Sequence, residues 1–374
     1  MAGKDSKLRI AVFTRPLDNW VSGSGHHLQE ILNAALDLAE DRMDFTFVHY
    51  KPSSNPIYKR RIKELIVPRN PLRSAAALRR EKFDVVHYAP LTIYSPIWRV
   101  PGLKLATLHG AEPLLLPQYY GKIMLAHETF VVPAYARRMD RIVTVSETSA
   151  SFIAEHFRVP RERISVCYNG LGPAYRILDG ADISAPGRYG VEGPFVLHVS
   201  RFSERKNPWT LLEAFSRLKA NYDRPLSFVC AGGGWNDEEV LDRVRELGLA
   251  ESFVAPGFVP EDDIVELMNA ASVFVFPSLA EGFGMPNVEA MACGCPVVTT
   301  PAFAVREIVG DAAVVVEDPR DPVKLSEAIH RVLSDEGLRS SLVERGLARL
   351  PLFSWTDSAK KLLAVYEEMA SAAS

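Results

Sequence analysis

Short apolar runs alternate with amphipathic stretches along almost the whole chain, and the alternation starts again near the middle. Such alternation is typical of strand–helix units whose strands form a parallel sheet. The pattern therefore predicts an α/β fold of two Rossmann-like β/α/β domains facing a central cleft, with ligands bound at the carboxyl ends of the strands. The predicted strands are 8–14, 45–50, 85–88, 104–108, 141–145, 164–167, 194–200, 226–230, 273–276, 296–299 and 313–316, and the predicted helices include 26–39, 73–82, 134–139, 147–156, 207–220 and 237–247.

The length of 374 residues fits two domains of about 150 residues each. Residues 169–191 contain five glycines and two prolines and little periodicity, which is typical of a linker. We expect a first domain over 1–180 and a second over 186–354. The halves also differ in charge, because residues 1–185 carry 25 Lys/Arg and 18 Asp/Glu, a net of +7, whereas residues 186–374 carry 18 and 28, a net of −10. This asymmetry favours different partners for the two domains.

The composition is that of a globular protein, with 47% apolar and 24% charged residues. It excludes a disordered, collagenous or coiled-coil chain. The longest uncharged run, 290–305, has 16 residues and two prolines, whereas a membrane span needs about 20 apolar residues. No apolar segment precedes the charged stretch Lys4–Arg9, and four cysteines in a chain of this size suit a reducing compartment. We therefore expect a cytoplasmic protein.

Residues 274–300 form the segment richest in chemistry. A predicted strand ends near Pro277, a loop with glycines carries Glu281, and Pro286 stands where a helix would begin. A helix start offers free N–H groups to an anion, and Glu289 would lie on the first turns of that helix. Carboxylates there could accept hydrogen bonds from a ribose diol and a sugar hydroxyl. The same spacing also fits a surface glutamate, a helix-capping glutamate and ordinary turn glycines.

This segment resembles the signature of glycosyltransferase family 4, the retaining GT-B enzymes of glycosyltransferase group 1. That signature is E-x-F-G-x-P-x-x-E followed by A-x-A-x-G-x-P-V-V. The resemblance implies a GT-B fold and a nucleoside-diphosphate-sugar donor, with Glu289 on the ribose and Glu281 on the hexose. It also implies that Phe283 and Gly284 belong to the donor site. The matching residues are Glu281, Phe283, Gly284, Pro286, Glu289, Ala290, Ala292, Gly294, Pro296, Val297 and Val298.

A second element covers residues 195–207, where Arg201 and Lys206 follow a predicted strand. Two cations at the carboxyl end of a strand can neutralise a diphosphate, although solvated loop charges are an alternative. The element resembles the family's G-R-x-x-x-x-K-G, whose Arg and Lys hold the donor phosphates. Here Ser200 replaces the first Gly and Asn207 replaces the last.

Two further elements belong to the first half. Gly23 and Gly25 follow the first predicted strand and resemble the family's glycine-rich loop near donor phosphate and acceptor, although an ordinary turn is an alternative. His109 ends a predicted strand in a T-x-H-G sequence. It could be a core or capping residue, but the resemblance implies that it reaches the donor sugar.

Smaller matches extend the resemblance over most of the chain. Phe258 follows Gly257 at the passage near the nucleotide base, Ala231–Gly234 match an A-G-x-G turn, and residues 355–371 match a last helix that packs back onto the first domain. No Asp-x-Asp sequence stands at a predicted strand end, and no His/Cys cluster has zinc spacing. We therefore expect no metal and no cofactor besides the donor substrate. No G-x-S-x-G sequence supports a hydrolase of the Ser-His-Asp type.

Residues 59–82 are strongly basic. Nine Lys/Arg, including Arg61, stand against Glu64 and Glu81. Together with nearby leucines, part of this segment could form a basic amphipathic helix that docks on an anionic membrane or attracts a lipid-linked acceptor. A solvated face is the alternative. The acidic second half argues against nucleic acid as a partner.

Together these patterns predict a retaining, metal-independent glycosyltransferase, cytoplasmic and peripheral on the inner face of a membrane. Its donor would be a nucleoside-diphosphate hexose, with mannose or glucose favoured, and its acceptor a glycan, a lipid-linked sugar or a small molecule. The predicted catalytic residues are Glu281, His109, Arg201 and Lys206. The predicted donor-binding residues are Glu289, Gly284, Phe283, Gly25, Gly23, Phe258 and Ser200. The alternatives are a GT-B-like nucleotide-sugar epimerase or hydrolase and a non-catalytic nucleotide-sugar binding subunit.

Overall fold

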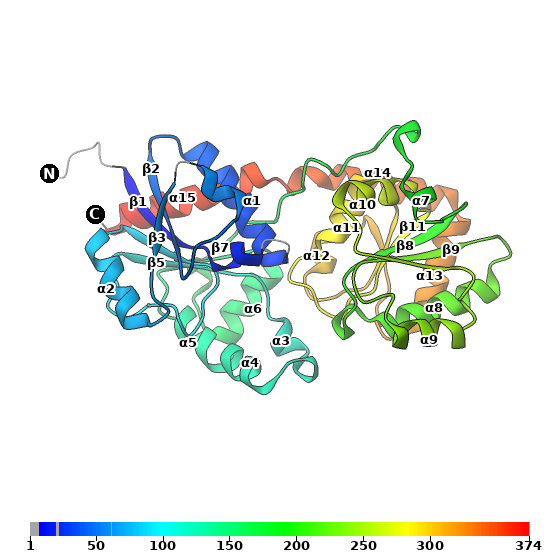
Figure 1. Cartoon of the computed structure of the whole chain (residues 1–374), viewed down its shortest axis with the longest axis horizontal. Coiled ribbons are helices and arrows are strands. Elements are labelled where there is room, and N and C mark those ends of the chain that lie inside the picture. Colours follow the sequence, from blue (N-terminus) through cyan, green and yellow to red (C-terminus); the bar gives the residue numbers. More distant parts are fainter. Residues whose placement is uncertain (1–6, 20–21, 61, 374) are drawn as a thin grey trace. The chain divides into compact units, whose positions relative to one another are not determined.

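The computed structural model describes residues 7–19, 22–60 and 62–373, so Lys4 and Arg61 lie outside the described residues. The chain forms two compact units (Figure 1). The first unit consists of Met1–Gly170 and Ser354–Ser374, and the second of Leu171–Phe353. Each unit has its own parallel sheet and its own core on both faces of that sheet.

The first unit contains a seven-stranded sheet in the order β3-β2-β1-β4-β5-β6-β7. All of its strand pairs are parallel. The order reverses between β1 and β4, as in a doubly wound fold. The strands are β1 (Leu8–Phe13), β2 (Met43–His49), β3 (Lys63–Ile66), β4 (Val85–Tyr88), β5 (Leu103–Leu108), β6 (Arg141–Thr144) and β7 (Ile164–Val166).

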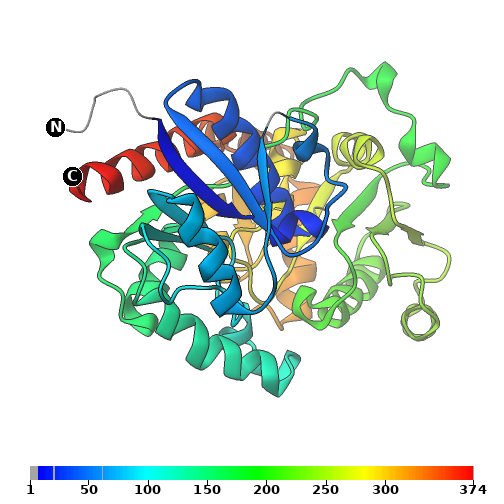
Figure 2. The same ribbon diagram turned by 60° about the vertical axis from the view of Figure 1, so that its left-hand side comes forward.

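Helices cover both faces of this sheet. Helix α1 (Gly23–Ala39) packs against the C-terminal helix α15 (Trp355–Ala373) on one face, through residues such as Leu32 and Tyr366. Helix α2 (Pro71–Glu81) lies on the other face (Figure 2), together with α5 (Val132–Ala136) and α6 (Glu147–Phe157). Two short helices, α3 (Glu112–Leu115) and α4 (Lys122–Ala126), stand between β5 and α5 and contribute no buried residue.

The basic segment 59–82 is only partly helical. Its first residue ends a 3-10 turn (Pro56–Lys59), and β3 then forms an edge of the sheet. Residues 63–66 are a strand because they pair with β2. Within the basic segment, the expected amphipathic helix is therefore α2 alone. Asn70 caps α2 by accepting hydrogen bonds from the N–H groups of Leu72 and Arg73, and Pro71 supplies its first turn.

The second unit contains a six-stranded parallel sheet in the order β10-β9-β8-β11-β12-β13. Its strands are β8 (Phe195–Val199), β9 (Ser227–Ala231), β10 (Phe253–Gly257), β11 (Val273–Phe276), β12 (Val297–Thr299) and β13 (Ala313–Val315). Its helices are α7 (Ala185–Arg188), α8 (Pro208–Asn221), α9 (Glu238–Glu246), α10 (Glu261–Ala270), α11 (Met285–Ala292), α12 (Val305–Val309), α13 (Pro322–Ser334) and α14 (Glu336–Arg349). Helices α7, α10, α11 and α12 cover one face and α8, α9 and α13 the other (Figure 1).

Residues 171–180 belong to the second unit, although the sequence analysis placed them in the first domain. Tyr175 and Leu178 pack against the core of the second unit, and the Leu178 N–H donates to Asn269 Oδ1 at 2.8 Å. These contacts explain the different boundary. The prediction of an α/β fold with two Rossmann-like domains is confirmed.

Candidate functional site

The centre of the second sheet carries two adjacent loops with predicted site residues. Strands β8 and β11 are hydrogen-bonded neighbours, although β9 and β10 lie between them in the sequence. The strand order reverses at this point, where ligands of open α/β sheets commonly bind. The loop after β8 carries Ser200, Arg201 and Lys206, and the loop after β11 carries Glu281 and Gly284.

Glu281 is a buried carboxylate held by cations. One of its oxygens, Oε1, lies 2.6 Å from Lys206 Nζ and 2.7 Å from Arg205 Nη1, and it also accepts a hydrogen bond from Ser278 Oγ. Burial alone would raise the pKa of this carboxyl, but the charges of Lys206 and Arg205 and the hydrogen bonds hold it at about 2. Glu281 is therefore ionised at neutral pH and can act as a hydrogen-bond acceptor.

The backbone of Glu281 is fixed as well. Its N–H donates to Ala302 O at 3.3 Å, and its carbonyl accepts from the Ala304 N–H at 3.1 Å. The residue between these partners, Phe303, has a φ of 56°. A left-handed conformation is unfavourable for an aromatic residue, and such strain persists where surrounding contacts impose it. The turn at Phe303 thus places Ala302 and Ala304 so that they bond to the N–H and the carbonyl of Glu281.

The cations of the loop after β8 differ in their surroundings. Arg201 is exposed and forms no ion pair with any residue that the structure describes. Lys206 is largely buried, with Nζ 4.6 Å from the centre of the Phe276 ring. Ser200 Oγ pairs with His198 Nε2 at 2.7 Å. Arg201 is therefore available to an anion, whereas Lys206 is shared with Glu281.

Helix α11 begins beside this loop. Gly284, with a φ of 89°, precedes the helix in a left-handed conformation that favours glycine. Asn287 is fully buried and donates to Gly284 O at 3.2 Å, while its Oδ1 is buried without a hydrogen-bond partner among the described residues. The ring of Phe283 is buried against Phe353, with 5.8 Å between ring centres. Phe283 thus supports the loop through packing.

Glu289 lies on α11 in an acidic neighbourhood. Burial and the negative charge of Glu261 raise the pKa of Glu289 to about 8, although Lys206 opposes the shift. The hydroxyl of Tyr175 hydrogen-bonds to Glu261, and burial next to these carboxylates raises the pKa of Tyr175. Glu289 is therefore largely protonated at neutral pH in this structure.

Two more predicted features stand at the same edge of the sheet. Phe258 directly follows β10 and is 78% exposed, which leaves its ring available for stacking. The turn after β9 approaches the loop after β8 closely, since a Cβ on Gly232 would lie 2.1 Å from Ser200 O. Glycine at this position lets the two loops touch.

The first unit holds the remaining predicted residues. Gly23 and Gly25 form the first turn of α1, where Ser22 Oγ accepts from the Gly25 N–H at 3.2 Å. His109 follows β5, and its ring meets that of His27 edge to face. Burial lowers the pKa of His109 well below its usual range, and His27 and His87 add to the effect. His109 is therefore neutral at physiological pH.

The sequence analysis singled out Glu281 and Lys206, without predicting that they pair, and it missed Arg205, Ser278 and His27. Arg205 precedes Lys206 and Ser278 precedes Glu281 by three residues, so their closeness to predicted residues was the available signal. His27 likewise follows the glycine pair. None of these side chains belongs to the resembling motifs.

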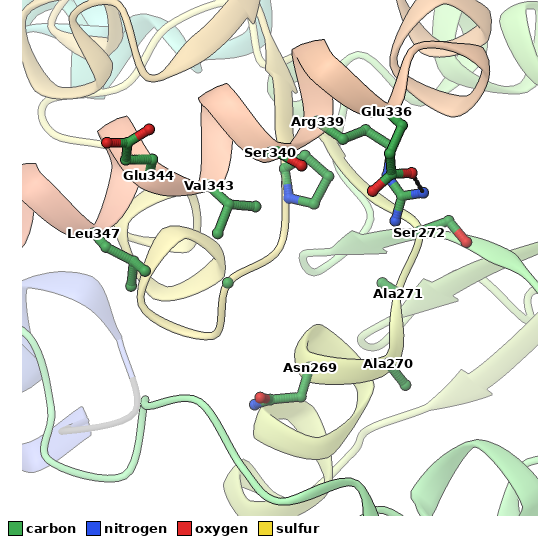
Figure 3. A pocket seen from close by; sticks show the side chains of 12 residues that line it. Asn269, Ala270, Ala271, Ser272, Glu336, Arg339, Ser340, Val343, Glu344 and Leu347 are labelled. Atoms are coloured by element: carbon green, nitrogen blue, oxygen red, sulfur yellow. Dashed lines mark hydrogen bonds and ion pairs between the residues drawn. The ribbon is translucent and has the colours of Figure 1, made fainter.

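A separate pocket opens at the opposite edge of the second sheet (Figure 3). Ser272 and Pro296 line it just before β11 and β12 begin, and α14 closes one side. Arg339 Nη1 pairs there with Glu336 Oε2 at 3.0 Å. The pocket contains none of the predicted site residues.

Comparison with known proteins covers both units. The family "Glycosyl transferases group 1" matches residues 183–349, and "Glycosyltransferase Family 4" matches residues 23–175. The O-antigen chain mannosyltransferase B of Escherichia coli is 31% identical over 309 residues, which cover 80% of this chain and 78% of that protein. The serotype-specific mannosyltransferase WbdA of the same species is 28% identical over 73% of this chain, which spans only 34% of that relative.

Solved structures agree on the fold. A glycosyltransferase from Rickettsia africae has a TM-score of 0.77 at 19% identity, covering 97% of this chain and 99% of that one. HepE of Anabaena, in complex with UDP and glucose, has a TM-score of 0.76 at 21% identity, covering 96% and 100%. The chain therefore belongs to glycosyltransferase family 4, the group 1 glycosyltransferases of GT-B fold.

Proposed function

We propose that this glycosyltransferase is a retaining, metal-independent mannosyltransferase that moves mannose from a nucleoside diphosphate to a hydroxyl of a glycan or lipid-linked acceptor. The observation that carries the proposal is the Lys206–Glu281 pair at the reversal of the second sheet. Arg201, in the same loop as Lys206, is exposed and forms no ion pair with a described residue. A carboxylate for the sugar and cations for the diphosphate then stand in one place. Mannose is favoured because two similar relatives are named mannosyltransferases.

The predicted site residues other than Phe283 and Ser200 have specific roles in the proposed reaction. Glu289 accepts hydrogen bonds from the ribose, and Phe258 lies at the base. Arg201 and Lys206 bind the diphosphate, and the backbone of Gly284 at the start of α11 lies at the phosphates or the sugar. The second domain would thus hold the nucleotide.

Glu281 of the second unit would hold the hexose, and His109 keeps the role at the donor sugar that the family resemblance implies. Glu281 can only accept hydrogen bonds, because its carboxyl is ionised. The neutral His109 has one donor and one acceptor nitrogen. Gly23 and Gly25, at the start of α1, would leave the backbone accessible near the acceptor and phosphates.

In the reaction the bond between the anomeric carbon and the phosphate oxygen breaks as the acceptor oxygen bonds to the same face of that carbon. The acceptor proton passes to the departing phosphate, so no covalent enzyme intermediate forms. Arg201 and Lys206 stabilise the negative charge that grows on the nucleoside diphosphate. In the proposed mechanism these two cations stabilise the leaving nucleoside diphosphate in place of a metal ion.

We also propose that the first domain docks on an anionic membrane carrying the acceptor. Arg73, Arg79 and Arg80 are exposed on α2. In the part of the chain that the structure describes, no helix is long and apolar enough to cross a bilayer. Exposed large apolar side chains in this unit are Ile66, Leu72, Ile93, Tyr94, Trp98, Leu115, Tyr119, Ile123, Met124 and Phe130. Exposed cations and apolar residues together suit an interfacial surface.

Flotation with phosphatidylcholine vesicles, with and without phosphatidylglycerol, tests the membrane proposal. Each basic residue near an anionic surface contributes about 1 kcal/mol. The protein should float only with the anionic vesicles, and replacing Arg73, Arg79 and Arg80 by Glu should abolish flotation. If the wild type and the variant float equally, with and without phosphatidylglycerol, the membrane proposal is overturned.

A thermal-shift panel with GDP, UDP, ADP and their sugars, without added metal, tests the donor site. A ligand at about 100 times its Kd stabilises by about 2.7 kcal/mol. One base should raise the melting temperature of the wild type and fail on Glu289→Ala. The anomeric configuration of the product, measured by NMR with GDP-mannose and octyl α-mannoside, tests retention. An inverted product, or no shift with any nucleotide, would refute the proposal.

A further inference from the structure

Arg205 connects the two loops at the centre of the second sheet. Its Nη1 donates to Ala280 O at 2.7 Å and lies 2.7 Å from Glu281 Oε1. Its own carbonyl accepts from the Leu279 N–H at 2.9 Å. Arg205 therefore fixes both the main chain before Glu281 and the carboxylate of Glu281.

The contacts to Glu281 all end on one oxygen. Lys206 Nζ, Arg205 Nη1 and Ser278 Oγ all approach Oε1. Among the described residues, no hydrogen bond ends on the other oxygen, Oε2, and the Glu281 side chain is 11% exposed. Two hydrogen bonds, from Lys206 and Ser278, use the acceptor capacity of Oε1, and the Arg205 guanidinium pairs with the same oxygen. The lone pairs of Oε2 therefore remain for a ligand.

The loop after β8 carries three cations, Arg201, Arg205 and Lys206. They differ in whether the side chain is open to a ligand or bound to the protein. Arg201 is exposed and unpaired among the described residues, so it can bind an anion. The side chain of Lys206 is 14% exposed and shared with Glu281, while that of Arg205 is 26% exposed and turned to Ala280 and Glu281. A diphosphate bound at Lys206 would compete with Glu281 for that ammonium group. The bonds of Arg205 to the protein do not depend on the ligand.

We propose that Arg205 is a positioning residue that holds the Glu281 carboxylate with Oε1 saturated by the protein and Oε2 presented to one hydroxyl of the donor hexose. The inference rests on the proposed function, which places the hexose at Glu281. Because Oε2 can only accept, the sugar position that faces it must carry a hydroxyl that donates. A site built on such a hydrogen bond rejects a donor without that hydroxyl.

The test compares GDP-mannose with its monodeoxy analogues, using octyl α-mannoside as acceptor. The wild type should reject one of these analogues by at least roughly 100-fold in kcat/KM. Arg205→Gln should lower kcat/KM for GDP-mannose and shrink this discrimination below about tenfold, because the carboxylate can rotate. Arg205→Lys, which keeps the charge and one donor, should restore part of the discrimination.

Two measurements separate positioning from general damage. Affinity for free GDP, measured by calorimetry, should stay within about threefold in Arg205→Gln, since the nucleotide is held elsewhere. Arg161→Gln is the matched control, because Arg161 also donates to a carbonyl, Ile164 O at 2.6 Å, and to a carboxylate, Glu147 Oε2 at 2.5 Å, in the first unit. This control should discriminate like the wild type.

The outcomes are distinguishable. If the wild type binds GDP and discriminates but Arg205→Gln does the same, the inference is overturned while the proposed function stands. If Arg205→Gln loses GDP affinity to the same degree as transfer activity, Arg205 is a nucleotide-binding residue. That result would also overturn the inference. If the wild type neither binds GDP nor uses any donor, the proposed function fails and the inference falls with it.

Discussion

The ring of His27 meets the ring of His109 edge to face, with 4.6 Å between ring centres. His27 Nδ1 pairs with Asn169 Oδ1 at 2.7 Å, and its ring lies 5.7 Å from that of Trp355. Asn169 and Trp355 flank the two points, at Gly170 and Ser354, where the chain passes between the units. The ring of His109, a predicted catalytic residue, therefore packs on His27. His27 in turn contacts Asn169 and Trp355, which lie next to the two boundaries between the units.

We expect the stability of the first unit to fall as the pH drops below 6.5, the ordinary histidine pKa. Burial lowers the pKa of His27 to about 4 and that of His87 to about 3. Between pH 6.5 and these lowered values the unfolded chain binds more protons than the folded one, so the free energy of unfolding decreases. The loss is about 1 kcal/mol per pH unit for each such histidine.

Hydrogen exchange of peptides covering 24–39 and 355–366, measured at several pH values after correction for intrinsic exchange, checks this prediction. His27→Gln should weaken the pH dependence, because the glutamine does not titrate. An unchanged dependence in this variant would show that His27 is not responsible.

Nucleotide affinity should rise with pH through about 8. Burial and Glu261 raise the pKa of Glu289 to about 8, so the free site is mostly protonated at neutral pH. The ribose hydroxyls need the carboxylate as acceptor, and binding at low pH must therefore expel a proton. From about pH 7 to 9 the affinity for GDP should increase up to about tenfold. Calorimetry measures it, and Glu289→Gln should give a flat profile; a flat profile in the wild type would contradict the assignment.

The fold was largely predictable because the long, strongly patterned elements carry their own signals. Strands β1 and β11 and helix α1 follow the predicted ranges closely. Strand β3 was not predicted, because half of its four residues are charged and only its pairing with β2 makes it a strand. Strand β10 escaped as well, since Pro256 and Gly257 argue against a strand in isolation.

Only those residues of the candidate site that match a family motif could be predicted from the sequence. The adjacency of the loops around Lys206 and Glu281 follows from the strand order, which no local pattern reveals. Arg205 contacts Glu281 only because that order brings the two loops together, whereas Ser278 contacts it within one loop. The left-handed backbone of Phe303 is likewise imposed by its neighbours and runs against the preference of an aromatic residue.

Glu281→Gln and Lys206→Ala should each lower transfer by at least about 100-fold, because each removes a charge that the proposal places on the donor. The fold should survive Lys206→Ala, since Arg205 remains on the carboxylate. Circular dichroism and steady-state rates measure both effects. Arg306→Ala, which breaks the exposed pair with Glu317 in the same unit, is the control and should behave like the wild type. Near-normal turnover in either site variant would refute the assignment.

Gly232→Ala and Gly233→Ala form a matched pair that tests the contact between the loops after β8 and β9. A Cβ on Gly232 would lie 2.1 Å from Ser200 O, and the φ of 130° is unfavourable for alanine, whereas a Cβ on Gly233 meets nothing within 4 Å. Gly232→Ala should therefore destabilise the second unit by about 2–3 kcal/mol and displace the loop that carries Arg201.

Calorimetric unfolding and GDP titration measure both consequences of this displacement. Gly233→Ala should retain the wild-type melting temperature and affinity. Gly232→Ala should lose both, because a shifted Ser200 moves Arg201 away from the position that the diphosphate requires. If Gly232→Ala melts early but binds GDP with unchanged affinity, the loop after β8 does not place Arg201 on the phosphates, and the nucleotide must be held by α11 alone.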